Sequence, residues 1–226
     1  MSDWTDGAGR KLAEYPHPST AVDIAVLTYS DGELRVLVVE HSLGDLALPG
    51  TFLHERERAA DAARRALRDK TSLTGIRFHQ IGVFDAPDRD PRGWVISIAH
   101  AAALPRKDLP GDAHLVCVRD GKAEQPLAFD HAEMVAAAVA DLRTRYAQRV
   151  DPDGLLGDEF TVLELRRLYE VIFGVPLQKD SFRRHVVDAL VSTGRMSSPG
   201  AGRPAELFRR KDGARLPAQA AVLFTG

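Results

Sequence analysis

The chain has 226 residues, of which 44% are hydrophobic and 27% are charged, an ordinary composition for a globular protein. At about 150 residues per domain, it has room for one large domain or for a medium and a small one. No apolar run approaches the roughly 18 residues that span a membrane, and residues 1–11 are too polar for a signal peptide. The single cysteine, Cys117, cannot form an internal disulfide or a zinc site by itself. We therefore exclude a membrane protein and expect a reducing, cytoplasmic location.

The charge is distributed unevenly along the chain. Residues 160–215 carry eleven Lys and Arg against six Asp and Glu, a net charge of +5. Because the whole chain carries −2, the remaining residues carry −7. A basic segment on a mildly acidic body indicates an anionic partner for one end of the chain, although charge also fluctuates along any sequence.

The first part of the chain predicts strands around one helix. Two apolar runs, Val22–Tyr29 and Leu34–Val39, are separated by Ser-Asp-Gly and therefore form a hairpin. Residues 58–70 are rich in Ala, Arg and Leu, which favour a helix. Further strands are expected over residues 78–84, 94–103 and 115–119. This mixture indicates an α+β or layered α/β domain.

A long helix is expected after Asp130, because Glu133 stands three residues later, the spacing of a capping box. Its apolar residues recur at helical spacing on one face: Met134, Val135, Ala138, Val139, Leu142 and Tyr146. This stripe is available for contacts within the chain and with a second copy. The turn residues 151–154 end the helix, and 150–159 form a linker. We predict one domain over 1–150 and a second over 151–226.

The second domain has the element order of a winged helix-turn-helix. Thr161 and Glu164 have the spacing of another capping box, and the helix that they begin ends at Gly174. A second helix is expected over 179–192, closed by Gly194. Two short strands, 195–197 and 205–210, would form the wing.

Four residues of this domain are candidates for DNA binding. Ser181, Arg183 and Arg184 lie near the start of the second helix, where a recognition helix meets the major groove. Arginine pairs bidentately with guanine or holds a phosphate. Arg203 stands at the expected wing tip, where it could enter a minor groove. The alternative is an ordinary solvated face, but the order helix, turn, helix, wing favours DNA.

Residues 48–73 resemble the Nudix box, G-x5-E-x7-R-E-U-x-E-E-x-G-U, in which U is apolar. Glu57 and Arg65 keep the spacing of the first glutamate and the arginine. The other defining positions differ: Thr51 and Ser72 replace the glycines, and Ala66, Asp69 and Lys70 replace the glutamates. In Nudix hydrolases these glutamates share a helix face and hold Mg²⁺ against a pyrophosphate. Without further resemblance, an ordinary Ala/Arg surface helix would explain the segment better than a Nudix box does.

The changes in the box predict a pocket without metal catalysis. The formal charge at the four acidic positions falls from −4 in a full box to −1 here, and Mg²⁺ requires oxygen ligands. We therefore expect no metal site, no catalytic residue and no cofactor. The resemblance implies that Glu57, Arg65, Lys70 and Arg92 belong to a nucleotide pocket, in which the Lys70 ammonium replaces the ion and Arg92 is a second cation. In the alternative, Lys70 pairs with Asp69 or Glu57 and the pocket binds nothing.

A second segment extends the resemblance. The charged loop 85–93, D-A-P-D-R-D-P-R-G, runs into an apolar strand and is similar to the segment after the Nudix helix in the NrtR family of Nudix-related transcriptional regulators of NAD metabolism. The tail is similar to the same family at 159–169, 182–184 and 202–205. The fold implied is an N-terminal Nudix-like α/β/α sandwich with a mixed sheet, joined to a C-terminal winged helix-turn-helix.

The same resemblance implies a function. Members of this family are homodimeric repressors that bind a palindromic operator of NAD biosynthesis or salvage genes and sense ADP-ribose or a related nucleotide. The expected partners are therefore operator DNA, such a nucleotide and a second copy of the chain. The alternative is a Nudix hydrolase of ADP-ribose or a related nucleoside diphosphate derivative, with the winged helix used for dimerisation.

Overall fold

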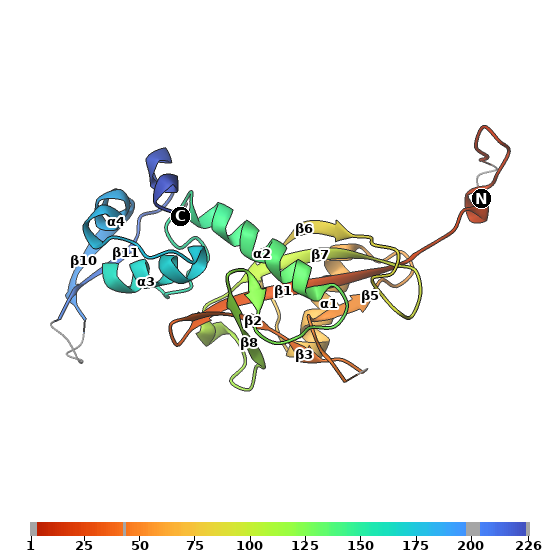
Figure 1. Ribbon diagram of the computed structural model, residues 1–226, viewed down its shortest axis with the longest axis horizontal. Coiled ribbons are helices and arrows are strands. Elements are labelled where there is room, and N and C mark those ends of the chain that lie inside the picture. Colours follow the sequence, from red (N-terminus) through yellow and green to blue (C-terminus); the bar gives the residue numbers. More distant parts are fainter. Residues whose placement is uncertain (1–3, 43, 198–203, 225–226) are drawn as a thin grey trace.

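A computed structural model describes residues 4–42, 44–197 and 204–224. The molecule is elongated (Figure 1). A mixed sheet lies in the middle, the N-terminal segment with the short helix Leu12–Glu14 projects from one end, and the winged helix lies at the other.

The sheet contains seven strands, β1 (Ser19–Ser30), β2 (Glu33–Leu37), β5 (Gly50–Phe52), β6 (His79–Phe84), β7 (Val95–Ala103), β8 (Leu115–Arg119) and β9 (Lys122–Ala123). Their order is β6-β7-β1-β2-β8-β9, and β5 also pairs with β1. The pair of β1 and β7 is parallel and the other pairs are antiparallel, so the sheet is mixed. A separate ribbon joins β3 (Val39–Glu40) to β4 (Leu46–Ala47). The predicted hairpin is confirmed: Asp31 and Gly32 take positive φ values of 55° and 81°, as tight two-residue turns require.

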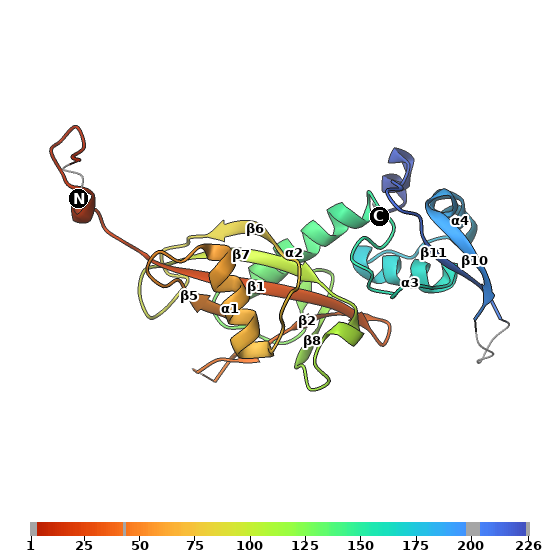
Figure 2. The same cartoon turned by 180° about the vertical axis from the view of Figure 1, so that it is seen from behind.

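Helices cover both faces of the sheet. Helix α1 (Ala59–Thr71) packs on one face, where Ala62, Ala63 and Leu67 are buried against Val22, Ile24 and Val26 of β1. Helix α2 (His131–Tyr146) packs on the other face (Figures 1 and 2). The alternation of β1 side chains between the two cores follows from the period of two in a strand. This arrangement confirms the α/β/α sandwich.

Two expectations about α2 are wrong. Asp130 is the N-cap residue, but its side chain makes no capping hydrogen bond, because both carboxylate oxygens accept from the guanidinium of Arg89. The apolar stripe of α2 is buried within this chain, with Met134 and Leu142 both 0% exposed. That face is therefore not available to a second copy.

The C-terminal region has the predicted winged-helix order. It comprises α3 (Val162–Phe173), α4 (Lys179–Val186), the short helix Val187–Ala189, β10 (Leu190–Met196), β11 (Glu206–Arg210) and a final short helix, Ala218–Phe224. The capping box of Thr161 and Glu164 and the left-handed Gly174 that ends α3 are confirmed. A backbone pair between Phe160 and Phe208 adds a third segment to the wing sheet.

Helix α4 is shorter than predicted. It ends at Val186, and Leu190–Met196 is a strand, so Gly194 lies inside β10 and closes no helix. The sequence 190–193, Leu-Val-Ser-Thr, contains β-branched residues that favour a strand. Leu190 is buried in the strand, and its spacing from Phe182 and Val186 also fits the buried face of a helix. The apolar spacing alone therefore could not distinguish a long helix from a helix followed by a strand.

The segment after α2 is packed and is not an open linker. The carboxylate of Asp151 is fully buried and accepts hydrogen bonds from the Tyr146 hydroxyl, from two backbone N–H groups and from Arg210. One hydrophobic core runs from the α2 face of the sheet through this junction into α3 and α4. Helix α2 is therefore shared by both parts of the molecule.

Candidate functional site

A pocket of about 390 Å³ opens beside β5, and its wall combines cations with aromatic rings. The charged and aromatic residues that line it come from β1, the end of β3, β5, α1, the loop before β7 and the start of α2: Asp23, Glu40, His41, Phe52, Lys70, Arg89, Asp90, Arg92, Phe129 and His131. A larger hollow of about 870 Å³ lies between residues 72–77, 103–110 and 152–158, but no aromatic ring lines it. The smaller pocket is the better candidate because it combines aromatic rings with Lys70 and Arg92, two of the residues expected at the nucleotide site.

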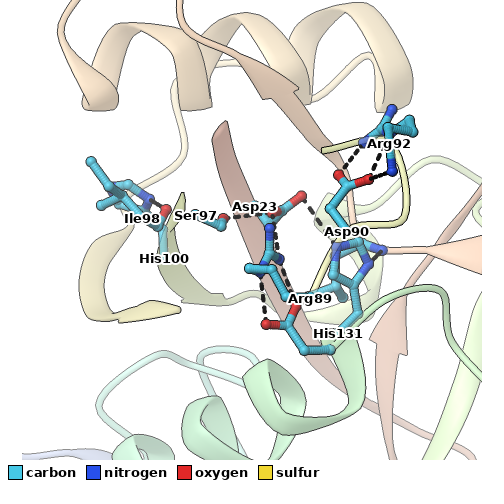
Figure 3. A network of polar contacts seen from close by, with 10 residues as sticks. Asp23, Arg89, Asp90, Arg92, Ser97, Ile98, His100 and His131 are labelled. Carbon is cyan, nitrogen blue, oxygen red and sulfur yellow. Dashed lines mark hydrogen bonds and ion pairs between the residues drawn. The ribbon is translucent and has the colours of Figure 1, made fainter. Parts of the chain in front are cut away.

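Asp23 lies at the centre of a buried polar network (Figure 3). Its Oδ2 accepts a hydrogen bond of 2.6 Å from the Ser97 hydroxyl, and its Oδ1 lies 3.4 Å from Nε2 of His131. Burial opposes ionisation of Asp23, but the contacts with His131, Ser97 and Arg89 hold its pKa below the usual value. Gly50 allows this arrangement, since a Cβ there would lie 1.8 Å from Oδ1 of Asp23.

His131, the first residue of α2, connects two walls of the pocket. The backbone N–H of Leu48 donates to its Nδ1 at 3.0 Å. Because Nδ1 accepts, we assign the ring hydrogen to Nε2, which faces Asp23. This single ring therefore joins β1, the loop before β5 and the amino end of α2.

Two arginines of the charged loop reach the pocket, and each is bound by a carboxylate. Arg89 is almost completely buried and donates to Asp130 at 2.8 and 2.5 Å. Arg92 donates to Asp90 at 2.9 and 2.7 Å, and its positive charge and hydrogen bonds lower the pKa of that carboxyl. The Arg92 guanidinium also lies 5.2 Å from the ring of Phe52 and 5.1 Å from the ring of Phe129, within cation–π range.

Lys70 stands in the last turn of α1, at the rim of the pocket. The side chain reaches water, but partial desolvation by the surrounding protein atoms and the nearby charge of Arg92 lower the pKa of its ammonium. Within the residues that the structure describes, no hydrogen bond or ion pair holds this ammonium. Asp69 and Glu57 were the two partners that the sequence suggested for Lys70. Asp69 pairs instead with Arg68, and Glu57 pairs with Arg65.

Glu57 and Arg65 form a bidentate pair, with nitrogen–oxygen distances of 3.0 and 2.7 Å. The hydrogen bonds from Arg65 lower the pKa of Glu57 to about 2. Arg65 also donates to the Phe52 carbonyl and the Thr51 hydroxyl, and both of these residues line the pocket. Glu57 and Arg65 themselves do not line the pocket. Through the bonds of Arg65 to Thr51 and Phe52, the pair supports β5.

The pocket brings Lys70 and Arg92 together. Asp23, Arg89 and His131 also line it, although they were not predicted from the sequence as site residues. One signal for Asp23 was available: it is the only charged residue in the apolar run from Ala21 to Leu27. Such a buried carboxylate needs specific partners. Among the described residues, no three His, Cys, Asp or Glu side chains lie close enough to hold a metal ion.

The candidate DNA-binding residues lie on α4. Arg183 and Arg184 are exposed, whereas Phe182 before them and Val186 after them are buried. Ser181 is half-buried, and its N–H donates to the Gln178 side chain, which caps α4. Arg203 lies outside the described residues.

Hydrogen bonds join helix α3 to the carboxyl end of α2. The hydroxyl of the buried Tyr169 donates to the backbone carbonyls of Tyr146 and Arg149, at 3.1 and 2.9 Å. From α2, Nε of Arg143 donates to the carbonyl of Ile172 at 2.7 Å. The position of the winged helix therefore depends on α2.

Comparison with known proteins identifies the family. Residues 154–210 match the NrtR DNA-binding winged helix domain. The chain is 31% identical over 209 residues to the ADPR responsive transcriptional repressor NtrR of Acinetobacter baylyi, covering 87% of this chain and 84% of that repressor. This chain belongs to the NrtR family. Its Nudix-like domain and winged helix are those expected from the sequence.

Two further relatives cover the chain to different extents. The crystal structure of Shewanella oneidensis NrtR complexed with a 27mer DNA has a TM-score of 0.71 and 30% identity, covering 90% of this NrtR-family chain and 96% of that one. An ADP-ribose pyrophosphatase of Methanocaldococcus jannaschii is 31% identical over 132 residues, which are 56% of this chain and 76% of that enzyme. Among the described residues, no helix is both long enough and apolar enough to cross a membrane.

Proposed function

We propose that this NrtR-family chain is a transcriptional repressor that binds operator DNA through its winged helix and binds ADP-ribose or a related nucleotide in the pocket beside β5. The observation that carries the proposal is Lys70, an ammonium without a partner among the described residues, at a position where a Nudix hydrolase has a metal-binding glutamate. The Acinetobacter relative, an ADPR responsive repressor, supports both parts of the proposal.

The pocket has the chemistry that a nucleoside diphosphate requires. Lys70 and Arg92 supply positive charge for the phosphates, and the rings of Phe52 and Phe129, which contact the Arg92 guanidinium, add apolar surface for a base. Its volume of about 390 Å³ lies within the range of small-molecule sites. Glu57 and Arg65 would act indirectly, by holding β5 in place.

In this proposal α4 is the recognition helix. Arg183 and Arg184 contact bases or phosphates, Ser181 lies at the start of the helix, and Arg203 belongs to the wing. One winged helix buries only about 600–1,000 Å² on DNA, so two copies on an inverted repeat would provide the area for specific binding. We propose a homodimer on a palindromic operator of NAD biosynthesis or salvage genes, with domains over 1–150 and 151–226.

Calorimetry with ADP-ribose tests the pocket. We expect binding in the presence of a chelator, because the site uses an ammonium in place of Mg²⁺. Binding that requires Mg²⁺, or no binding, would contradict the proposal. For the DNA part, an inverted repeat selected from a random duplex library should bind the chain in an anisotropy titration at fixed salt.

A second candidate function is hydrolysis of ADP-ribose, and the similarity to the pyrophosphatase favours it. Against it, the four acidic positions of the box carry a charge of −1, and Ala66 is buried and offers no oxygen ligand. Chromatography of AMP released from ADP-ribose with Mg²⁺ or Mn²⁺ decides between the two. Turnover near ordinary enzyme rates, about 1–10³ s⁻¹, would establish the hydrolase.

A further inference from the structure

A second cavity, which we call the adjoining hollow, meets the pocket beside β5. It has a volume of about 510 Å³ and lies between the end of β2, the strand β3, the carboxyl end of α1 and the connection that precedes β8. Glu40 and Lys70 line both the pocket and the adjoining hollow, so the two meet at these residues. A ligand that reaches the Lys70 ammonium from the pocket can therefore continue into the adjoining hollow.

The ionisable side chains of the adjoining hollow differ from those of the pocket. Beyond Lys70 at the boundary, they are Glu40, Asp112 and His114 among the described lining residues, and no arginine is present. No hydrogen bond or ion pair engages the side chain of Glu40, Asp112 or His114 within the described part of the chain. Two unpaired carboxylates repel a phosphate, but they accept strong hydrogen bonds from the hydroxyl groups of a sugar.

The backbone and the apolar residues of the adjoining hollow favour the same kind of ligand. Residues 70–72, at the carboxyl end of α1, line it. The last carbonyl groups of a helix and the negative end of its dipole lie at such an end, where they disfavour an anion and can accept from a hydroxyl. Val39, Pro110 and Ala113, all half-buried, add apolar surface for the C–H groups of a sugar ring.

The position of Lys70 determines which part of a ligand enters the adjoining hollow. Phe52 and Phe129 line the pocket, whereas no phenylalanine, tyrosine or tryptophan among the described residues lines the adjoining hollow. A nucleotide with its base in the pocket and its phosphates at Lys70 therefore extends into the adjoining hollow with the group that follows its second phosphate.

We propose that the adjoining hollow is a subsite for an uncharged sugar attached to the second phosphate of the nucleotide. Asp112 and Glu40 accept hydrogen bonds from the sugar hydroxyls, and Lys70 holds the phosphates at the boundary. This inference rests on the proposed function and narrows its ligand to a nucleoside diphosphate sugar. Asp112, which lines only the adjoining hollow, is then a specificity-determining residue.

ADP is the ligand that such a subsite rejects. It has the base and both phosphates of ADP-ribose, but it ends in a phosphate monoester, which carries a charge of about −1.5 to −2 at neutral pH. In the adjoining hollow this group meets the carboxylates of Glu40 and Asp112 and gains no hydroxyl contact. We therefore expect the chain to bind ADP-ribose at least about tenfold more tightly than ADP.

The test is calorimetric titration of ADP-ribose and of ADP into the parent and into Asp112→Ala, with a chelator and at fixed salt, because salt screens exposed charges. In Asp112→Ala we expect ADP-ribose to bind about tenfold more weakly, since a charged acceptor is lost. ADP should bind as in the parent or up to about fivefold more tightly, since a repulsion is lost. A merely structural role of Asp112 would weaken both ligands. Asp108→Ala is the matched control: Asp108 is also exposed, lies on the same connection and lines neither the pocket nor the adjoining hollow, so both affinities should stay unchanged.

The outcomes distinguish the sugar subsite from the proposed function. If the parent binds ADP as tightly as ADP-ribose, the subsite is overturned and the nucleotide pocket stands. The same holds if Asp112→Ala binds ADP-ribose as tightly as the parent does, or if it loses affinity for both ligands together. A parent that binds neither ligand in the presence of the chelator overturns the proposed function and the subsite together.

Discussion

Replacement of Lys70 by methionine tests whether an ammonium takes the place of a metal ion. The substitution keeps a long apolar side chain at the pocket rim and removes only the charge. A hydrogen bond to a charged group contributes about 1.5–3 kcal/mol. Because Lys70 is exposed to water, the lower value, about 1.5 kcal/mol, applies, and this corresponds to about a tenfold change in the dissociation constant.

The assay is calorimetric titration of ADP-ribose into the chain with a chelator present. We expect the dissociation constant of Lys70→Met to be about ten times that of the parent. Lys122→Met, which removes an exposed lysine of β9 outside the pocket, should bind as the parent does. If Lys70→Met binds ADP-ribose as tightly as the parent does, Lys70 does not contact the phosphates and the reasoning about the altered box is refuted.

Three further predictions concern stability and DNA binding. Tyr169→Phe keeps the ring but leaves the carbonyls of Tyr146 and Arg149 without their donor, so urea titration should give a loss of about 1–3 kcal/mol, and an unchanged midpoint would show that water replaces the hydroxyl. The folded-state pKa of Glu57, about 2, lies below its ordinary value of 4.5, so its contribution to stability is present above pH 4.5 and is lost as the pH falls toward 2. Melting curves across that range should therefore show a smaller acid-induced loss for Glu57→Gln than for the parent, and parallel losses would contradict the assignment. Arg184→Ala should weaken operator binding by about 1–3 kcal/mol if the arginine contacts a base, with unchanged melting; parent-like affinity would show that α4 is wrongly assigned.

Local patterns predicted most of the fold. Strand alternation, the Asp-Gly turn of the first hairpin and the capping box of Thr161 and Glu164 each depend on residues close in the sequence. These features could therefore be predicted from the sequence alone. The end of α4 could not, because the apolar spacing of Phe182, Val186 and Leu190 fits both a longer helix and a helix followed by a strand.

The candidate site was predicted only in part, because its contacts join residues far apart in the sequence. Lys70 was found through the spacing of the Nudix-like segment, and Arg92 through the charged loop. The local rule for Asp130 predicted a cap, but an ion pair with Arg89, 41 residues away, took its carboxylate. Whether a carboxylate caps its own helix or pairs with a distant arginine depends on which groups the fold brings close to it, and the local sequence does not show this.

The most direct test of the central claim is the effect of ADP-ribose on operator binding in the presence of a chelator. A fluorescent inverted-repeat duplex, selected from a random library, is titrated with the chain at fixed salt, with and without the nucleotide. We expect ADP-ribose to change the affinity by at least about fivefold without any divalent metal. An affinity that does not change, or that changes only when Mg²⁺ is supplied, would contradict it.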